Sequence, residues 1–361
     1  MATLDREDLV PLLADVVYGQ GPVEPTSVHV RERSGQPGFD GTARVRNLVL
    51  EINSPRGRHP LLLTVITPSH ADDVPMFVGL NFRGNHTIDA DASLSLSPEG
   101  TGRLHYDRFT TDPQPRGARA SRWQVPMLLA NGFGLATACY LQLGPDSPDL
   151  RTTGVFPLLQ GSDTATWGGI GMWAWALQRL LDVLREESLG SAHIAFGHSR
   201  LGKTALWAAV QDPRFAGVIA NDSGCLGASM STAAGAETPG LLARVRPYWF
   251  CEGFAARVRE QNPWPGADVL LAAINPRPVY VASAADDLPA DPAGEREAVE
   301  RARRRAPHGR FGYHVREGPH DVTATDWEHF LDYFARELPA TPPRPSPATH
   351  AHRPGEGGPM P

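Results

Sequence analysis

The stretch 193–210, HIAFGHSRLGKTALWAAV, places a serine at the apex of a strand, a tight turn and a helix. An apolar run ends at Phe196, and an Ala/Leu/Trp pattern of helical spacing begins directly after Ser199. Gly197 and Gly202 supply the small residues that such a turn needs beside the serine. This kind of turn exposes the hydroxyl above a sheet edge and directs a helix N-terminus at it. The pattern predicts that Ser199 is a nucleophile; a Gly-x-Ser turn without chemistry is the alternative.

A serine nucleophile needs a base to take its proton and an acid to orient that base. His320 lies in the turn REGPHD, residues 316–321, between a strand-like run and the last helical pattern. Asp222 and Asp287 lie between Ser199 and His320 in the chain, each after an apolar run. The order serine, acid, histidine is that of α/β-hydrolases. These residues therefore predict a catalytic triad in which either aspartate is the acid.

Two cations, Arg200 and Lys203, follow the serine in the first turn of the predicted helix. Positive charge at a helix N-terminus opposes the helix dipole, so we expect an anion nearby, either a developing oxyanion or an anionic substrate. A solvated helix start is the alternative for both residues. The loop Gly79–His86, GLNFRGNH, either adds backbone donors to an oxyanion site or only connects two elements. Among the tryptophans, we expect Trp167 to stack on a sugar.

The elements that must position these residues alternate along the chain. Apolar and β-branched runs predict strands at Ala43–Ile52, Leu61–Thr67, Met76–Asn81, Gly134–Tyr140, His193–Phe196, Gly217–Asn221, Val279–Ala284 and Phe311–Val315. Helical spacing is found at Trp167–Arg185, Lys203–Gln211, Glu295–Arg305 and Thr323–Glu337. This order predicts a mostly parallel central sheet with an antiparallel start, flanked by helices, which is the α/β-hydrolase fold.

We expect one catalytic domain over residues 40–337, preceded by an N-terminal helix and lead-in over residues 1–39. The Pro-rich residues 338–361 have almost no apolar side chains, so we expect a disordered tail.

The composition excludes several classes of function. The 361 residues carry a net charge of −6 without a basic block, so we expect no nucleic-acid partner; the dense run Arg301–Arg305 suits a solvated helix face. No apolar run approaches the roughly 18 residues of a membrane span, and no secretory signal is visible, so we expect a cytoplasmic protein without a membrane partner. Three cysteines suit a reducing compartment, with Cys225 and Cys251 as a candidate pair. No spacing indicates a metal site or a cofactor.

Seven segments carry a family resemblance that covers about residues 40–337. They are GLNFRGNHT (79–87), SRWQVPMLLANGFGLATACY (121–140), WGGIGMWAWALQRL (167–180), GHSRLGKTALWA (197–208), NDSGCLG (221–227), residues 276–292 and residues 312–327. On these segments the chain resembles the glucuronoyl esterases of carbohydrate esterase family 15, particularly the bacterial branch. The Ser-Arg-x-Gly-Lys string is the most specific of its motifs.

The resemblance implies roles for individual residues. Ser199 would be the nucleophile, His320 the base and Arg200 an oxyanion stabiliser, while Lys203 and Glu237 would contact the hydroxyls of a uronate. The family places its acid at either of two positions, which match Asp222 and Asp287 here. Many fungal members have glutamate at the first position. The shorter side chain of Asp222 favours Asp287 as the acid.

The chain departs from the family pattern at two sites. Family members often have tryptophan two residues after the second acid, where this chain has Pro289, and the usual Arg-rich run before Glu237 is STAAGA, residues 231–236. Most members are also secreted.

We therefore expect a serine carboxylic ester hydrolase without a cofactor, acting on esters of glucuronic acid or a related sugar. The alternatives are an acetyl-carbohydrate or small-ester esterase of intracellular metabolism, or a carbohydrate-binding relative without catalysis. The oligomeric state stays open.

Overall fold

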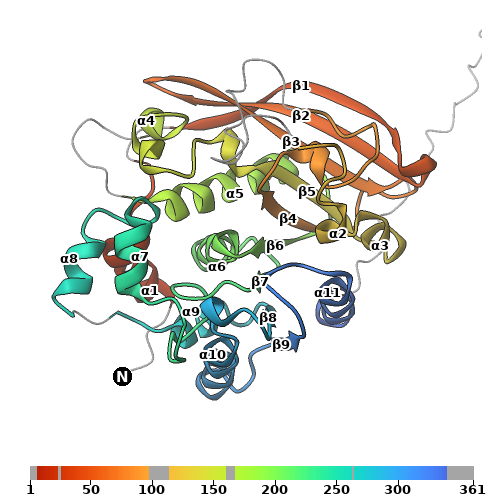
Figure 1. Cartoon of the computed structure of the whole chain (residues 1–361). Coiled ribbons are helices and arrows are strands. Elements are labelled where there is room, and N and C mark those ends of the chain that lie inside the picture. The colour runs from red at the N-terminus through yellow and green to blue at the C-terminus, as the bar shows by residue number, and fades with distance from the viewer. Residues whose placement is uncertain (1–5, 23–25, 97–113, 160–166, 262–263, 340–361) are drawn as a thin grey trace, which may run out of the picture.

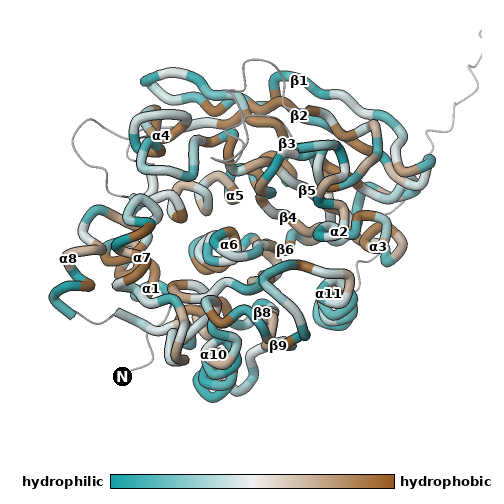
Figure 2. Tube along the Cα trace, viewed as in Figure 1, coloured by the Kyte–Doolittle hydropathy of each residue, from teal (hydrophilic) through white to brown (hydrophobic). Residues whose placement is uncertain are grey.

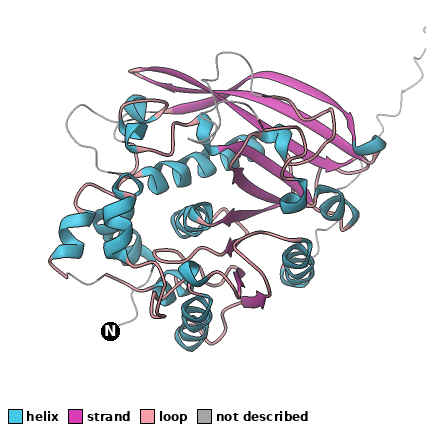
Figure 3. Cartoon of the chain, viewed as in Figure 1, coloured by secondary structure: helices cyan, strands magenta, loops and turns pink. Residues whose placement is uncertain are grey.

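A nine-stranded sheet organises the residues that the computed structural model describes, which are 6–22, 26–96, 114–159, 167–261 and 264–339. Its strands lie in the order β1-β2-β3-β5-β4-β6-β7-β8-β9 (Figure 3). Their bounds are β1 Ser27–Gly38, β2 Ala43–Ser54, β3 Gly57–Pro68, β4 Pro75–Asn81, β5 Gly134–Cys139, β6 Ala192–His198, β7 Gly217–Asn221, β8 Val279–Ala284 and β9 Phe311–Arg316.

The sheet has an antiparallel and a parallel part. β1, β2 and β3 form an antiparallel meander, and β3 also runs antiparallel to β5. From β5 through β4, β6, β7 and β8 to β9, every pairing is parallel. The prediction of a mostly parallel sheet with an antiparallel start is confirmed. All parallel strands end at the same edge, and loops at that edge can therefore meet in one site.

Helices cover both faces of the parallel part (Figure 1). One face carries α1 (Arg6–Leu13), α5 (Gly169–Glu186), α6 (Arg200–Gln211), α9 (Ala267–Ala272) and α10 (Pro292–Arg305), whose buried side chains belong to the larger apolar core. The other face carries α3 (Val125–Ala130) and α11 (Ala324–Glu337), which pack in a second core. The remaining short α-helices are α2 (Ala120–Trp123), α4 (Phe156–Leu159), α7 (Pro239–Val245) and α8 (Phe254–Arg259).

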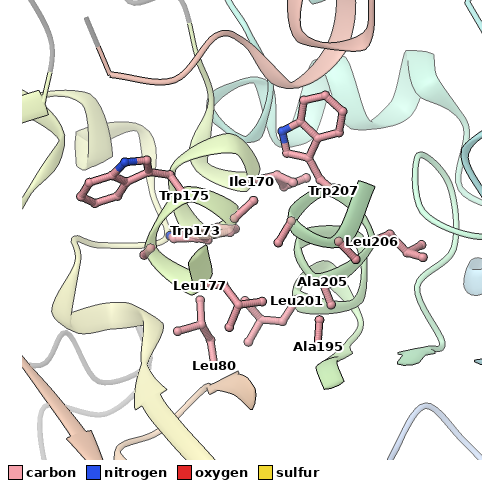
Figure 4. Packing of buried hydrophobic residues seen from close by; sticks show 14 of the residues in the cluster. Leu80, Ile170, Trp173, Trp175, Leu177, Ala195, Leu201, Ala205, Leu206 and Trp207 are labelled. Carbon is pink, nitrogen blue, oxygen red and sulfur yellow. The ribbon is translucent and has the colours of Figure 1, made fainter. Parts of the chain in front are cut away.

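The helix that carries the site is held between the sheet and its neighbour. In Figure 4, Leu177 of α5 lies beside Leu201 of α6, and both side chains are buried. Small residues on α6 allow this close approach of the two helices. Fully burying a large apolar side chain contributes roughly 1.5–3 kcal/mol, so this interface fixes the start of α6 firmly.

The outer helix α10 confirms the interpretation of the basic run Arg301–Arg305. Figure 2 shows α10 as predominantly hydrophilic, and Arg301 donates to Glu297 one turn earlier at 3.0 Å. None of the described helices is both long and apolar enough to cross a membrane.

The structure differs from the sequence-based expectations in the start of the domain and in the cysteine pair. Residues 27–38, expected as a lead-in outside the catalytic domain, form β1 and pair along β2, so the domain begins before residue 40. Cys225 and Cys251 are buried free thiols, so the candidate pair is not formed. Residues 340–361, where we expect disorder, lie outside the described residues.

Candidate active site

Ser199 occupies a strained backbone position between β6 and α6. Its φ of 58° and ψ of −130° lie outside the regions that non-glycine residues normally adopt. The Ser199 N–H donates to the Asn221 carbonyl at 2.9 Å, and the Ser199 carbonyl accepts from the Gly202 N–H at 2.8 Å. A Cβ on Gly197 would lie 1.9 Å from the Leu201 carbonyl oxygen, so only glycine fits there. The predicted turn is therefore present, with Ser199 at its apex.

Ser199 and His320 line the same cavity, which has a volume of about 220 Å³. The other lining residues follow β4 and β5, lie at the end of β6 and the start of α6, or belong to α2 and the turn before it. The described residues that line this cavity include no carboxylate and four arginines, Arg83, Arg119, Arg122 and Arg200. Such a concentration of guanidinium groups suits negative charge that develops on an ester oxygen.

His320 is bonded to Asp287, the acid that the family resemblance favours. It lies on the loop between β9 and α11, and its Nδ1 hydrogen-bonds to Oδ2 of Asp287, which follows β8. Because a carboxylate oxygen only accepts, Nδ1 carries the proton and Nε2 is left as the basic nitrogen. The imidazole side chain is 41% exposed, whereas the Asp287 side chain is 6% exposed. This arrangement can orient a general base beside Ser199.

Asp222 lies close to the same base but is bonded elsewhere. Its Oδ1 accepts from the Ala284 N–H at 2.7 Å, while its buried Oδ2 accepts no hydrogen bond from the described residues. Arg316 lies 3.8 Å from that oxygen but directs its Nε to Asp326 at 2.7 Å. Burial, followed by the charge of Glu295, raises the pKa of Asp222 to about 8. Asp222 therefore holds the end of β8 in place and is favoured in its neutral form.

The ligand atoms of Asp222, Asp287 and His320 lie within 4.8 Å of one another, close enough for a metal ion. A metal there would compete for the Nδ1 and Oδ2 atoms that already bond to each other.

A buried carboxyl group joins the loop after β7 to the end of β8, the segments that precede or carry the two aspartates. Glu295 of α10 accepts from the Ser223 hydroxyl at 3.0 Å, from the Gly224 N–H at 2.9 Å and from the Ser283 hydroxyl at 2.6 Å. Burial raises the pKa of Glu295 to about 7. These bonds fix the end of β7 against the end of β8, and so fix the spacing of Asp222 and Asp287.

The counterion of Arg200 is a carboxylate of the protein itself. The Arg200 guanidinium forms an ion pair with Asp146 and lies between the rings of Phe82, at 5.6 Å, and Trp249, at 5.0 Å. Asp146 also accepts from the Tyr140 hydroxyl at 2.9 Å and from the Trp249 indole N–H at 2.8 Å. The charge at the helix start therefore does not require an anionic substrate. It is held at the cavity wall by a fixed partner.

The loop after β4 reaches the cavity with side chains, among them Phe82 and Arg83. Two of its backbone amides are used internally, because Asn81 Oδ1 accepts from the Arg83 N–H at 3.3 Å and from the Gly84 N–H at 2.8 Å. These two amides are therefore not oxyanion donors. The loop therefore contributes side chains to the cavity wall, and these two amides contribute no hydrogen bonds to a substrate.

Lys203 and Glu237 are brought together, as the resemblance implies. The Lys203 ammonium lies 3.8 Å from the Glu237 carboxylate and donates to the Ser223 carbonyl. The Glu237 N–H donates to the Pro289 carbonyl at 2.9 Å, so this pair lies beside the loop that follows Asp287. Lys203 is only 3% exposed, and burial lowers its pKa. Glu237 is the more accessible member of the pair.

The structure does not bring Trp167 to the cavity. Its indole is 1% exposed and packs against the rings of Phe156 and Trp175. A ring enclosed by other aromatic rings cannot offer a face to a sugar. The expectation of stacking is therefore corrected: Trp167 is a core residue.

Asp146 and His198 are among the site residues that the sequence analysis did not single out. Asp146 follows β5 at the same carboxyl edge as the other polar residues, and this position after a buried strand is the signal that points to it. His198 precedes the nucleophile and lines the cavity, with its ring centroid 4.4 Å from that of His320. The sequence shows a histidine directly beside the predicted nucleophile, but the spacing does not indicate what role it has.

Comparison with known proteins gives relatives along most of the chain. The family model described as glucuronyl esterase, fungi, matches residues 115–303. Carbohydrate esterase MZ0003, from an unknown prokaryotic organism, is 30% identical over 91% of this chain and 83% of its own length. A glucuronoyl esterase from Solibacter usitatus is 30% identical, with a TM-score of 0.81 over 92% of both chains.

A CE15 esterase from a marine bacterial metagenome, described as promiscuous, is 29% identical with a TM-score of 0.81 over 92% of this chain and 91% of its own. The predicted α/β-hydrolase fold is confirmed by these structures together with the observed sheet.

The hydrogen bond between His320 and Asp287 predicts unequal roles for the two aspartates. Asp287→Asn should lower the rate of Ser199 labelling by a fluorophosphonate about 10²–10⁴-fold, because the base would lose its orienting acceptor. Asp222→Asn should lower it by less than about 10-fold. The measurement is the second-order labelling rate of each variant. A larger loss at Asp222 would reverse the assignment of the acid.

The raised pKa of Asp222 predicts a specific effect of pH on stability. Between the ordinary aspartate pKa of about 4 and the folded value of about 8, the folded protein holds a proton that the unfolded chain releases. The free energy of unfolding should therefore fall as the pH rises through this window, by at most about 1.4 kcal/mol per pH unit from this group. Asp222→Asn should flatten that slope in urea unfolding at pH 5, 6, 7 and 8. Identical slopes would contradict the neutral form of Asp222.

Proposed function

The chain belongs to the glucuronoyl esterase family, carbohydrate esterase family 15, and we propose that it hydrolyses esters of glucuronic acid through an acyl-enzyme on Ser199. Family membership makes it a serine esterase that acts on sugar esters. The observation that carries the finer proposal is the His320–Asp287 hydrogen bond at the wall of the cavity that also exposes Ser199.

The first half of the reaction forms the acyl-enzyme. Ser199 Oγ attacks the ester carbonyl carbon and passes its proton to Nε2 of His320. Asp287, bonded at Nδ1, stabilises the imidazolium that forms. The negative charge moves to the carbonyl oxygen, where we place the Arg200 side chain, held by Asp146. The carbon–oxygen bond to the alcohol then breaks, and the alcohol leaves with the proton from His320.

The second half releases the acid. Water gives a proton to Nε2 of His320 and attacks the acyl carbon, and Ser199 Oγ leaves with that proton. The products are the alcohol and a uronate anion.

The sugar that carries the ester carbonyl is proposed to lie beside Lys203 and Glu237. Lys203 lies in α6, which follows β6, and Glu237 lies in the segment after β7. The Glu237 N–H is bonded to the loop after Asp287, and its carboxylate faces Lys203. A carboxylate and an ammonium at 3.8 Å from each other can accept from and donate to neighbouring sugar hydroxyls. With Trp167 in the core, the aromatic face that a sugar would stack on is not supplied by that residue.

The proposed substrate is tested by a panel of esters. Benzyl and methyl glucuronate should be hydrolysed with higher kcat/KM than methyl galacturonate and acetylated xylan. Ser199→Ala and His320→Ala should each lower kcat by about 10³-fold or more, because the triad acts as a unit. Preference for acetylated xylan would favour the acetyl esterase alternative. Hydrolysis that survives in Ser199→Ala would exclude Ser199 as the nucleophile.

The position of Arg200 predicts an effect on kcat alone. Arg200→Ala should lower kcat on benzyl glucuronate by about 10²–10³-fold and change KM little, since the oxyanion exists only in the transition state. Arg246→Ala is the matched control, because Arg246 also lies over the Trp249 ring, at 5.6 Å, but does not line the cavity. A rise in KM at constant kcat would assign Arg200 to ground-state binding.

Pro289 predicts weak recognition of the sugar. It is exposed, and it stands where relatives often have a tryptophan that offers an apolar face and an indole N–H. Pro289→Trp should lower KM for benzyl glucuronate about 5-fold, which corresponds to about 1 kcal/mol of added contact. The measurement is kcat and KM for glucuronate and galacturonate esters in both proteins. Strong glucuronate preference in the wild type would show that another residue already supplies this contact.

A further inference from the structure

His320 is held by fewer contacts than its proposed role as a base demands. Its side chain is 41% exposed and lies on a loop, and among the described residues its Nδ1 has one acceptor, Asp287. This hydrogen bond and the covalent bond to Cβ hold one side of the ring, while Nε2 lies on the opposite side. The direction of Nε2, which must face Ser199, therefore needs a second constraint.

The second contact is the ring of His198. The two imidazole centroids lie 4.4 Å apart, with an angle of 39° between the ring planes. His198 is the last residue of β6 and directly precedes Ser199, so it is fixed to the same rigid turn as the nucleophile. A flat group on that turn can therefore set the plane of the base relative to the hydroxyl.

His198 is itself well anchored. It is 5% exposed, its Nδ1 lies 2.5 Å from Oδ1 of Asn221 at the end of the paired strand β7, and the Phe82 ring meets it edge-on at 6.1 Å. The acceptor Asn221 Oδ1 places the proton on Nδ1 of His198. Groups from several elements face this ring: His320, Asp222 at 3.9 Å, Arg122 and Arg200.

The neutral state of His198 suits a position beside a base. Burial, followed by the charges of His320 and Arg122, holds the pKa of His198 well below its ordinary range. When His320 takes the serine proton it becomes a cation, and a neutral aromatic ring accepts a cation on its face, whereas a second cation would repel it.

We propose that His198 is a positioning residue, whose ring face, anchored by Asn221 and Phe82, sets the plane of His320 so that Nε2 stays directed at Ser199. The proposal rests on the proposed role of His320 as the base. It assigns to His198 no contact with the substrate and no proton transfer.

Two substitutions of similar size separate the ring face from the hydrogen bond. His198→Phe keeps a flat ring and loses the bond to Asn221, while His198→Gln keeps a polar group for Asn221 and loses the ring. His329→Ala is the control, because it removes a histidine ring that stacks at 4.2 Å on His314 outside the cavity. Each variant is measured for kcat and KM on benzyl glucuronate and for its rate of labelling by a fluorophosphonate, which needs no sugar recognition.

The expected result is a loss in the glutamine variant alone. His198→Gln should lower kcat and the labelling rate by the same factor, about 10²-fold, with KM changed less than about 2-fold. His198→Phe should stay within about 5-fold of the wild type, and His329→Ala should be unchanged. The low-field proton resonance of the His320 Nδ1–H should be sharp in the wild type and in the phenylalanine variant. In the glutamine variant it should be broader than in the wild type.

Other outcomes overturn the proposal. Equal rates in the two His198 variants, or a change confined to KM, would mean that the ring face does not set the base. If His198→Gln does not fold, the phenylalanine variant decides alone, and a loss above about 10-fold there overturns the proposal. A wild-type protein that is not labelled at all would instead contradict the proposed function, so the two failures are distinguishable.

Discussion

The backbone at Ser199 is the constraint on which the site depends. A φ of 58° at a serine costs of order 1–3 kcal/mol and persists only where the surroundings leave no alternative. Here the surroundings are the pairing of β6 with β4 and β7, the glycine at 197, and the packing of α6 against α5. The strain is concentrated at the residue whose hydroxyl must stand clear of the sheet. The apolar packing of the sheet and of α5 against α6 thus offsets the strain at Ser199 that places its hydroxyl clear of the sheet.

The same alignment of parallel strands brings the remaining groups to that atom. Asp146 follows β5, Asp222 follows β7, Asp287 follows β8 and His320 follows β9, and each bonds to a partner from another segment of the chain. Glu295 of α10 bonds both to the loop after β7 and to strand β8. Little reorganisation is then needed when charge develops during a reaction, because the dipoles and charges are already held in place.

Most of this arrangement could be predicted from the chain, and the exceptions have physical reasons. Buried strands such as Val279–Ala284 are mostly apolar runs, and the proposed catalytic residues each follow a strand that such a run predicts. Their spacing therefore indicates them as candidates, but it leaves open which of Asp222 and Asp287 is the acid. β1 has the polar sequence SVHVRERSGQPG because it lies at the edge of the sheet with most side chains exposed, which removes the apolar signal. The Arg200–Asp146 pair joins residues 54 positions apart, and only the folded chain shows that they meet. Trp167 illustrates the reverse error, since an aromatic residue near a site is more often core than ligand contact.

The exposed strand β1 also affects whether one molecule can associate with another through its sheet edge. In the described sheet it is the outermost strand and pairs only with β2. A long, flat strand in that position would be a template for a strand of another molecule. β1 instead carries Arg31, Glu32 and Arg33 in succession, a register shift between Val30 and Glu32, and Pro37 without a backbone N–H. The charged side chains, the register shift and the missing N–H thus hinder another strand from pairing with β1. Substitutions that remove the register shift or the charges would promote aggregation while leaving the distant cavity intact.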